Sequence, residues 1–171
     1  GLDVALLEFP GYGARPGAPS LTTLAGAALD AVDALEREGG PVWLVGESLG
    51  SGVAARAAAL RPKVVRGLLL VTPYAELSAV ARHHYPFLPA ALLRDRFAPA
   101  LDLVGSRTPA VLLVAGRDEV VTAEQGRLLF EAIPGPKRLV EQPDATHNGL
   151  DLSPQLPFWR DAVLFLEEGG R

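Results

Sequence analysis

The stretch that decides the fold runs from residue 42 to residue 60 and reads VWLVGESLGSGVAARAAAL. Its first four residues, Val42 to Val45, are an apolar run typical of a buried strand. The turn Gly46-Glu47-Ser48-Leu49-Gly50 follows at once. The small residues from Ser48 to Leu60 then predict a helix, which ends before Pro62. A strand, a tight glycine turn and a helix therefore meet at one serine.

The glycine turn matches the pattern G-x-S-x-G, which between a strand and a helix is typical of a nucleophile elbow. The serine of such a turn adopts a strained backbone conformation. We expect side chains two residues before and after it to clash, so that Gly46 and Gly50 are both required. Ser48 would lie at a helix N-terminus, where the dipole favours developing negative charge. The alternative is an incidental turn, because the chain has 18 glycines.

A serine hydroxyl needs a base to act as a nucleophile, and the chain offers three histidines. His147 follows the last predicted strand, so we expect it at the carboxyl edge of the sheet, where open α/β folds place their sites. We take His147 as the candidate base; the alternative is a surface-loop histidine. His83 and His84 lie together in an irregular stretch, and we expect them to be exposed loop residues.

The acidic partner is expected between the serine and the histidine in the sequence. Asp118 follows a predicted strand and meets this condition, and its neighbour Glu119 is the alternative. Asp144 is closer to His147 in the sequence, but an acid three residues before a histidine more often caps their shared loop. The order Ser48, Asp118, His147 differs from the orders of two unrelated protease folds.

Elsewhere short apolar runs alternate with helical patterns. The runs that predict strands are Leu2–Leu7, Val42–Val45, Val64–Val71, Ala110–Ala115 and Arg138–Glu141. Helices are predicted from the N-cap Ser20 to Gly39-Gly40, and over 48–60, 123–133 and 157–168. This alternation predicts an α/β fold, with a mostly parallel sheet and helices on both faces. Burial on both faces explains why the strands are nearly all apolar.

The composition excludes several functional classes. The 171 residues are 49% hydrophobic and 21% charged, which is typical of one globular domain. The net charge of −4 leaves no electrostatic footprint for nucleic acid. No apolar run approaches the ~20 residues of a membrane span, and with no visible signal peptide we expect a cytoplasmic protein. Cysteine is absent and no metal-ligand spacing occurs, so we expect no metal and no cofactor.

Four segments together resemble the α/β-hydrolase superfamily of serine hydrolases: FPGYG at 9–13, GESLGS at 46–51, GRDEVV at 116–121 and PDATHN at 143–148. The chain is similar, over essentially all its residues, to a compact bacterial branch related to α/β-hydrolase-domain esterases and depalmitoylases. The resemblance implies Ser48 as nucleophile, Asp118 as acid, His147 as base and the Leu49 N–H as an oxyanion donor. It implies a small-molecule ester or acyl substrate, cleaved through an acyl-enzyme without a cofactor.

One part of the family pattern is absent. The second oxyanion donor of this family comes from a His-Gly loop, after a strand that precedes the one expected at Leu2–Leu7. In the family that strand lies between the strands expected at Leu2–Leu7 and Val42–Val45. Either the natural protein extends upstream of Gly1, which we favour, or these two strands pair directly in a rearranged sheet. We therefore expect residues 1–171 to be a single but partial domain and a poor catalyst.

The stretch from Thr72 to Thr108 falls where this family inserts its lid, and here it is short and irregular. Its apolar side chains either form an acyl pocket over Ser48 or only cover the sheet: Tyr74, Tyr85, Phe87, Leu88, Leu92, Leu93 and Phe97. Both interpretations stay open. So do three alternatives to an ester hydrolase, namely a thioesterase, a serine peptidase and a non-catalytic binding module, because a fold does not decide its chemistry.

Overall fold

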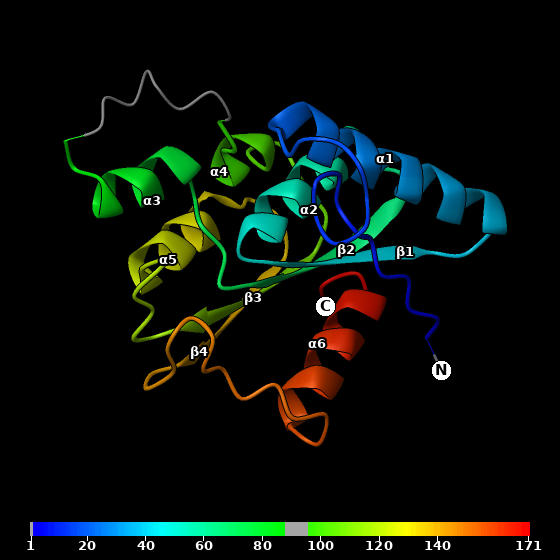
Figure 1. Ribbon diagram of the computed structural model, residues 1–171. Coiled ribbons are helices and arrows are strands. Elements are labelled where there is room, and N and C mark those ends of the chain that lie inside the picture. Colours follow the sequence, from blue (N-terminus) through cyan, green and yellow to red (C-terminus); the bar gives the residue numbers. More distant parts are fainter. Residues whose placement is uncertain (1, 88–95) are drawn as a thin grey trace.

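The computed structural model of the chain describes residues 2–87 and 96–171 (Figure 1). In this part of the chain four parallel strands form one sheet in the order β1 (Val42–Glu47), β2 (Val65–Val71), β3 (Ala110–Ala115) and β4 (Lys137–Gln142). The helices are α1 (Leu21–Glu38), α2 (Leu49–Leu60), α3 (Leu77–His84), α4 (Pro99–Asp102), α5 (Ala123–Ala132) and α6 (Pro157–Glu167). The predicted α/β fold with a parallel sheet is confirmed.

Helices cover both faces of the sheet (Figure 1). On one face α1, α2 and α5 share a core with the strands, and the small side chains of α2, such as Ala55 and Ala58, are fully buried there. Small side chains let a helix approach a sheet closely, which explains the alanine-rich sequence of α2. On the other face α6 packs Phe165 and Leu166 against Leu69 and other residues of β2 and β3.

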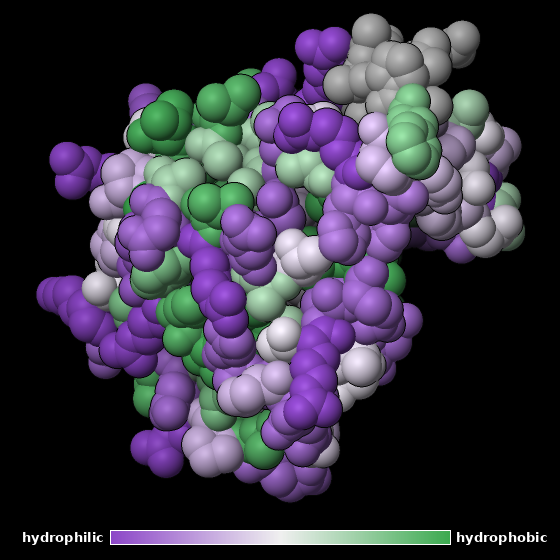
Figure 2. Space-filling model, turned by 90° about the vertical axis from the view of Figure 1, so that its left-hand side faces the viewer, coloured by the Kyte–Doolittle hydropathy of each residue, from purple (hydrophilic) through white to green (hydrophobic). Residues whose placement is uncertain are grey.

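The two central strands are more deeply buried than the two outer strands. Every residue of β3 is buried, and in β2 only Arg66 is exposed. Strand β4 forms an edge and is only half-buried, which suits its polar sequence KRLVEQ. The side of the molecule at the left of Figure 1, which carries α3, α5 and β4, is largely hydrophilic with scattered hydrophobic patches (Figure 2).

The strand predicted over Leu2–Leu7 is wrong. This segment has no regular secondary structure and pairs with no strand in the described part of the chain, and Val4 and Leu6 are 81% and 94% exposed. Strand β1 is therefore an edge, and its Val45 is 68% exposed. The suggested direct pairing of Leu2–Leu7 with Val42–Val45 is also wrong. A strand forms only where a neighbour satisfies its backbone N–H and C=O groups, and an apolar pattern does not supply that neighbour.

Helix α1 begins and ends as its sequence indicates. The side chain of Ser20 accepts a hydrogen bond from the Thr23 N–H at 3.1 Å, and the Thr23 hydroxyl accepts one from the Ser20 N–H at 2.9 Å. Gly39 then ends the helix in a left-handed conformation with φ 86°, which glycine adopts without strain. The N-cap predicted at Ser20 is confirmed.

The stretch from Thr72 to Thr108, predicted to be irregular with broken helical pieces, contains the short helices α3 and α4, and two buried aromatic residues beside them pack in the core. Tyr74 and Phe97 are 1% and 2% exposed and lie against Gly52 of α2, where an added Cβ would come within 2.2 Å of the Tyr74 hydroxyl. Burial raises the pKa of that Tyr74 hydroxyl. These two aromatic residues thus fill the core, whereas Tyr85 and Phe87 are exposed. The apolar residues Leu88, Leu92 and Leu93 lie outside the described residues.

Candidate active site

Ser48 lies in the tight turn between β1 and α2. Its backbone has φ 49° and ψ −118°, a left-handed conformation that is rare outside glycine. Two contacts hold it there: the Ser48 N–H donates to the Val71 carbonyl at 2.9 Å, and the Ser51 hydroxyl donates to the Ser48 carbonyl at 2.6 Å. A strained backbone of this kind costs on the order of 1–3 kcal/mol and persists only where the surroundings enforce it.

The two glycines of the G-x-S-x-G turn are not equivalent. A Cβ on Gly46 would lie 2.4 Å from the Gly50 carbonyl oxygen and 2.9 Å from the Cβ of Ala54, so only glycine fits at position 46. A Cβ on Gly50 would meet nothing within 4 Å among the described atoms that surround it. The expectation that both positions require glycine is confirmed at Gly46 and is wrong at Gly50. The crowding arises because β1 passes directly under the first turn of α2.

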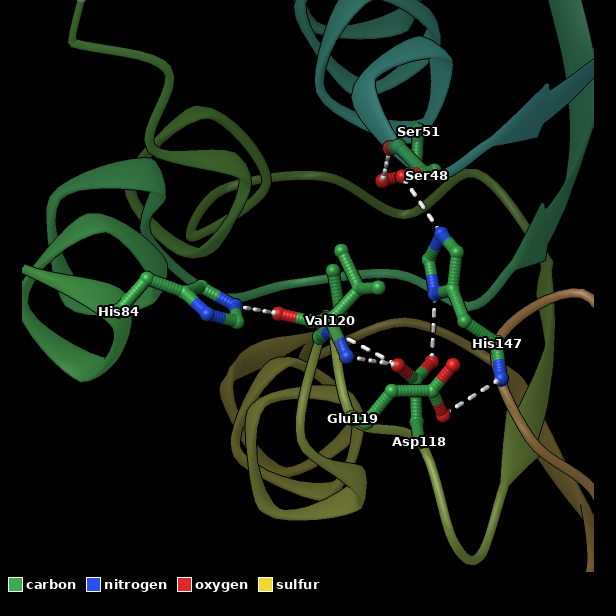
Figure 3. Close-up of polar contacts among 8 residues, drawn as sticks. Ser48, Ser51, His84, Asp118, Glu119, Val120 and His147 are labelled. Carbon is green, nitrogen blue, oxygen red and sulfur yellow. Dashed lines mark hydrogen bonds and ion pairs between the residues drawn. The ribbon is translucent and has the colours of Figure 1, made fainter.

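Ser48, His147 and Asp118 come together in one chain of hydrogen bonds (Figure 3). The Ser48 Oγ lies 3.1 Å from Nε2 of His147, and Nδ1 of His147 lies 2.7 Å from Oδ2 of Asp118. The side chains of His147 and Asp118 are only 9% and 1% exposed. Since a carboxylate only accepts, Nδ1 carries the proton, and in the neutral imidazole Nε2 then has a lone pair facing the serine hydroxyl. Nε2 of His147 thus lies within hydrogen-bond distance of the Ser48 hydroxyl.

The carboxylate of Asp118 is held from its other side by the backbone. Its Oδ1 accepts hydrogen bonds from the N–H groups of Val120 at 2.8 Å and Val121 at 2.7 Å. Oδ2 is thereby aimed at His147, and two donors help to satisfy a charge that would otherwise be costly to bury. Sequence reasoning did not identify the donors Val120 and Val121, because backbone groups leave no signal in the residue types.

Two loops at the carboxyl edge of the sheet bring Asp118 and His147 together. The Gly116 N–H donates to the Gln142 carbonyl at 2.9 Å, and the Arg117 N–H donates to the Ala145 carbonyl at 2.8 Å. A Cβ on Gly116 would lie 2.3 Å from the Pro143 carbonyl oxygen, so glycine is what allows the loops to approach. The close pairing of β3 with β4 therefore continues into the loops that carry Asp118 and His147.

The alternative site residues lie elsewhere. Nδ1 of His147 pairs with Asp118 and not with Glu119, whose Oε2 accepts a 3.4 Å hydrogen bond from the backbone N–H of His147. Asp144 is exposed and forms an ion pair of 2.8 Å with Arg117. His83 and His84 are exposed as predicted, but they lie on α3 and not in a loop. Nε2 of His84 lies 2.8 Å from the carbonyl oxygen of Val120, a contact that sequence reasoning missed.

Leu49 is the first residue of α2 and follows Ser48 directly, so its N–H has no acceptor within the helix. In residues 2–87 and 96–171 no group of three His, Asp or Glu side chains is placed to hold a metal ion. None of the helices described there is long and apolar enough to cross a membrane. A cavity of about 730 Å³ opens beside Trp43 and Pro109, at the end of the sheet opposite Ser48.

Comparisons with known proteins identify the family of the chain. The model of the alpha/beta hydrolase family matches residues 1–104, which include Ser48. The chain therefore belongs to the alpha/beta hydrolase family. It is 35% identical over 158 residues to an uncharacterized protein of Mycobacterium tuberculosis, an alignment that covers 89% of this chain and 55% of that protein. The chain thus spans about half the length of this curated relative.

The chain also resembles a short segment of one further curated protein and the folds of two solved structures. The chain is 42% identical over 45 residues to the thiohydrolase aneE of Aspergillus aculeatus, covering 26% of this chain and 14% of that one. The monoacylglycerol lipase of Paleococcus ferrophilus superposes with a TM-score of 0.67 at 23% identity, covering 95% of this chain and 82% of the lipase. Est1E of Butyrivibrio proteoclasticus, solved with ferulic acid, gives a TM-score of 0.73 at 16% identity, covering 96% and 76%. At such identities the structures show the shared fold.

Proposed function

We propose that this protein is a serine hydrolase that cleaves a carboxylic ester through an acyl-enzyme. The observation that carries the proposal is the hydrogen-bonded series from Ser48 through His147 to Asp118, with the serine on a strained turn at a helix N-terminus. Membership of the alpha/beta hydrolase family and the fold shared with a lipase support it. The partner is then a small-molecule ester or acyl substrate.

The reaction would proceed in two steps. Nε2 of His147 takes the Ser48 proton as Oγ attacks the ester carbonyl, and the oxyanion that forms is stabilised by the Leu49 N–H at the start of α2. The alcohol leaves with the proton returned by His147, and the acyl group stays on Oγ. His147 then takes a proton from water, whose oxygen attacks the acyl carbonyl. The bond to Oγ breaks, His147 returns the proton to Ser48, and the carboxylic acid is released. Asp118 holds the tautomer and stabilises the imidazolium in both steps.

Hydrolysis of a p-nitrophenyl ester of a short acid tests the proposal. We expect slow turnover that is lost in Ser48→Ala and kept in Ser153→Ala, a serine that hydrogen-bonds to Asp151 and lies in an exposed loop. The expectation of slow turnover follows from a single assigned oxyanion donor, since such a donor is typically worth about 2.7–4 kcal/mol. Equal rates of ester hydrolysis for the unsubstituted protein and for Ser48→Ala, or no hydrolysis by either, would overturn the proposal and favour a non-catalytic binding module.

A thioester is the second candidate substrate, favoured by the local similarity to the thiohydrolase aneE. The same three side chains serve either leaving group, because both reactions pass through the same acyl-enzyme. Comparing kcat/KM for an oxygen ester and a thioester of one acyl group separates the candidates. A higher value for the thioester would move the assignment from ester hydrolase to thioesterase and leave the roles of Ser48, Asp118 and His147 unchanged.

A further inference from the structure

The C-terminal end of α3 reaches the loop that carries Asp118 through one side chain, His84. Its Nε2 lies 2.8 Å from the carbonyl oxygen of Val120, and Figure 3 shows the ring extending from α3 toward that carbonyl. A carbonyl oxygen only accepts hydrogen bonds, so Nε2 carries the proton and donates. His84 takes no direct part in the two-step reaction, because its described hydrogen bond is to Val120 and not to Ser48 or His147.

The peptide group that accepts this hydrogen bond also donates one to Asp118. The carbonyl of Val120 and the N–H of Val121 belong to the same peptide unit, and this N–H donates to Oδ1 of Asp118 at 2.7 Å. A hydrogen bond accepted at a peptide carbonyl polarises the peptide and strengthens the donation by its N–H. His84 therefore acts on the Asp118 carboxylate through a single peptide group. From there the contacts continue to His147 at 2.7 Å and to Ser48 at 3.1 Å.

The contact of His84 with Val120 lies beside a cavity that separates α3 from the start of α5. A cavity of about 390 Å³ lies between α3 and the start of α5, with Val80 and His83 on one side and Val120 and Gln125 on the other. The only buried residue of α3 is Ser78, near its first turn, and there the Leu77 N–H donates to the Phe97 carbonyl at 2.8 Å. The first turn is thus anchored in the core, whereas the last turn meets the acid loop across a cavity through His84.

We propose that His84 is a positioning residue that couples α3 to the acid loop and sets the orientation of Asp118. The inference rests on the proposed function, since it needs Asp118 to act as the acid. His84 touches neither Ser48 nor His147 in the described contacts, so it acts through the Val120–Val121 peptide. A substrate that moves the last turn of α3 would thereby alter the hydrogen bonds that aim Asp118 at His147.

Three substitutions test the inference by ester hydrolysis with kcat and KM measured separately. His84→Leu removes the donor, His84→Gln keeps an N–H donor of similar reach, and His83→Leu is the matched control on the neighbouring exposed histidine. A hydrogen bond of about 0.5–1.5 kcal/mol corresponds to roughly 2–12-fold in rate. We expect His84→Leu to lower kcat by about that factor with KM unchanged. His84→Gln should recover most of the loss, and His83→Leu should have no effect.

Other outcomes decide against the inference. An unchanged kcat in His84→Leu would overturn it, and so would an equal loss in His83→Leu or no recovery in His84→Gln. The midpoint of urea unfolding, measured for each variant, shows whether a fall in kcat merely follows a loss of stability. If the unsubstituted protein hydrolyses the ester no faster than Ser48→Ala does, the proposed function itself is overturned. An active protein that is insensitive to His84→Leu would overturn only the role of His84.

Discussion

The two glycines of the Ser48 turn allow a matched test of how the turn is built. Gly46→Ala places a Cβ 2.4 Å from the Gly50 carbonyl oxygen. Real Cβ contacts are essentially never shorter than 3.0 Å, so this oxygen has to move by roughly 0.6 Å. Overpacking of this kind costs about 1–3 kcal/mol. Gly50→Ala meets open space in a helical backbone, so it should cost nothing and stabilise by up to about 1 kcal/mol.

The displaced carbonyl belongs to the first turn of α2, so the shift is passed to Ser48. Its Oγ is only 3.1 Å from His147, and misplacement by about 1 Å can cost on the order of 100-fold in rate. Urea unfolding followed by the fluorescence of Trp43 and Trp159 measures stability, and ester turnover measures alignment. We expect Gly46→Ala to lose both and Gly50→Ala to lose neither. Equal effects of the two substitutions, in either assay, would refute this account of the turn.

Three further perturbations have expected outcomes. Thr72 has φ 43° and is 2% exposed, and its hydroxyl has no hydrogen-bond partner among the described residues. Thr72→Val should therefore raise the free energy of unfolding, measured in urea, by about 1 kcal/mol. A loss of stability would mean that the hydroxyl does have a hydrogen-bond partner. A hydrogen bond from Arg61 lowers the pKa of Asp33, so Asp33 stabilises the fold above about pH 4 and loses this effect as the pH falls through its folded pKa. The thermal midpoint of Asp33→Asn should consequently depend less on pH below 4 than that of the natural protein, and parallel curves would contradict this. Asp118→Asn should lower kcat on the order of 10⁴-fold, because the amide no longer fixes the tautomer of His147, and a loss under tenfold would speak against Asp118 as the acid.

The parts of the fold that the sequence predicted are those set by local chemistry. The cap at Ser20, the strand before Gly46 and the helix after Ser48 each depend on a few neighbouring residues, and each is confirmed. The approach of Asp118 to His147 could also be anticipated, because both follow parallel strands and so lie at one edge of the sheet.

The predictions that were wrong or missing concern contacts between residues distant in the sequence. Leu2–Leu7 has the composition of a strand, but no described neighbour supplies its hydrogen bonds. The difference between Gly46 and Gly50 arises because only the Cβ of position 46 would point into the crossing of β1 and α2. The contact of His84 with Val120 joins residues 36 positions apart through a backbone oxygen, which no residue pattern encodes.

The central claim is that Ser48 is the nucleophile, and covalent labelling tests it most directly. A fluorophosphonate reacts with a serine only where a base activates it, and mass spectrometry of the digested protein locates the adduct. We predict one adduct, on Ser48, that is lost in His147→Ala. An unlabelled protein would contradict the claim, as would an adduct on Ser51, the buried neighbour whose hydroxyl donates to the Ser48 carbonyl.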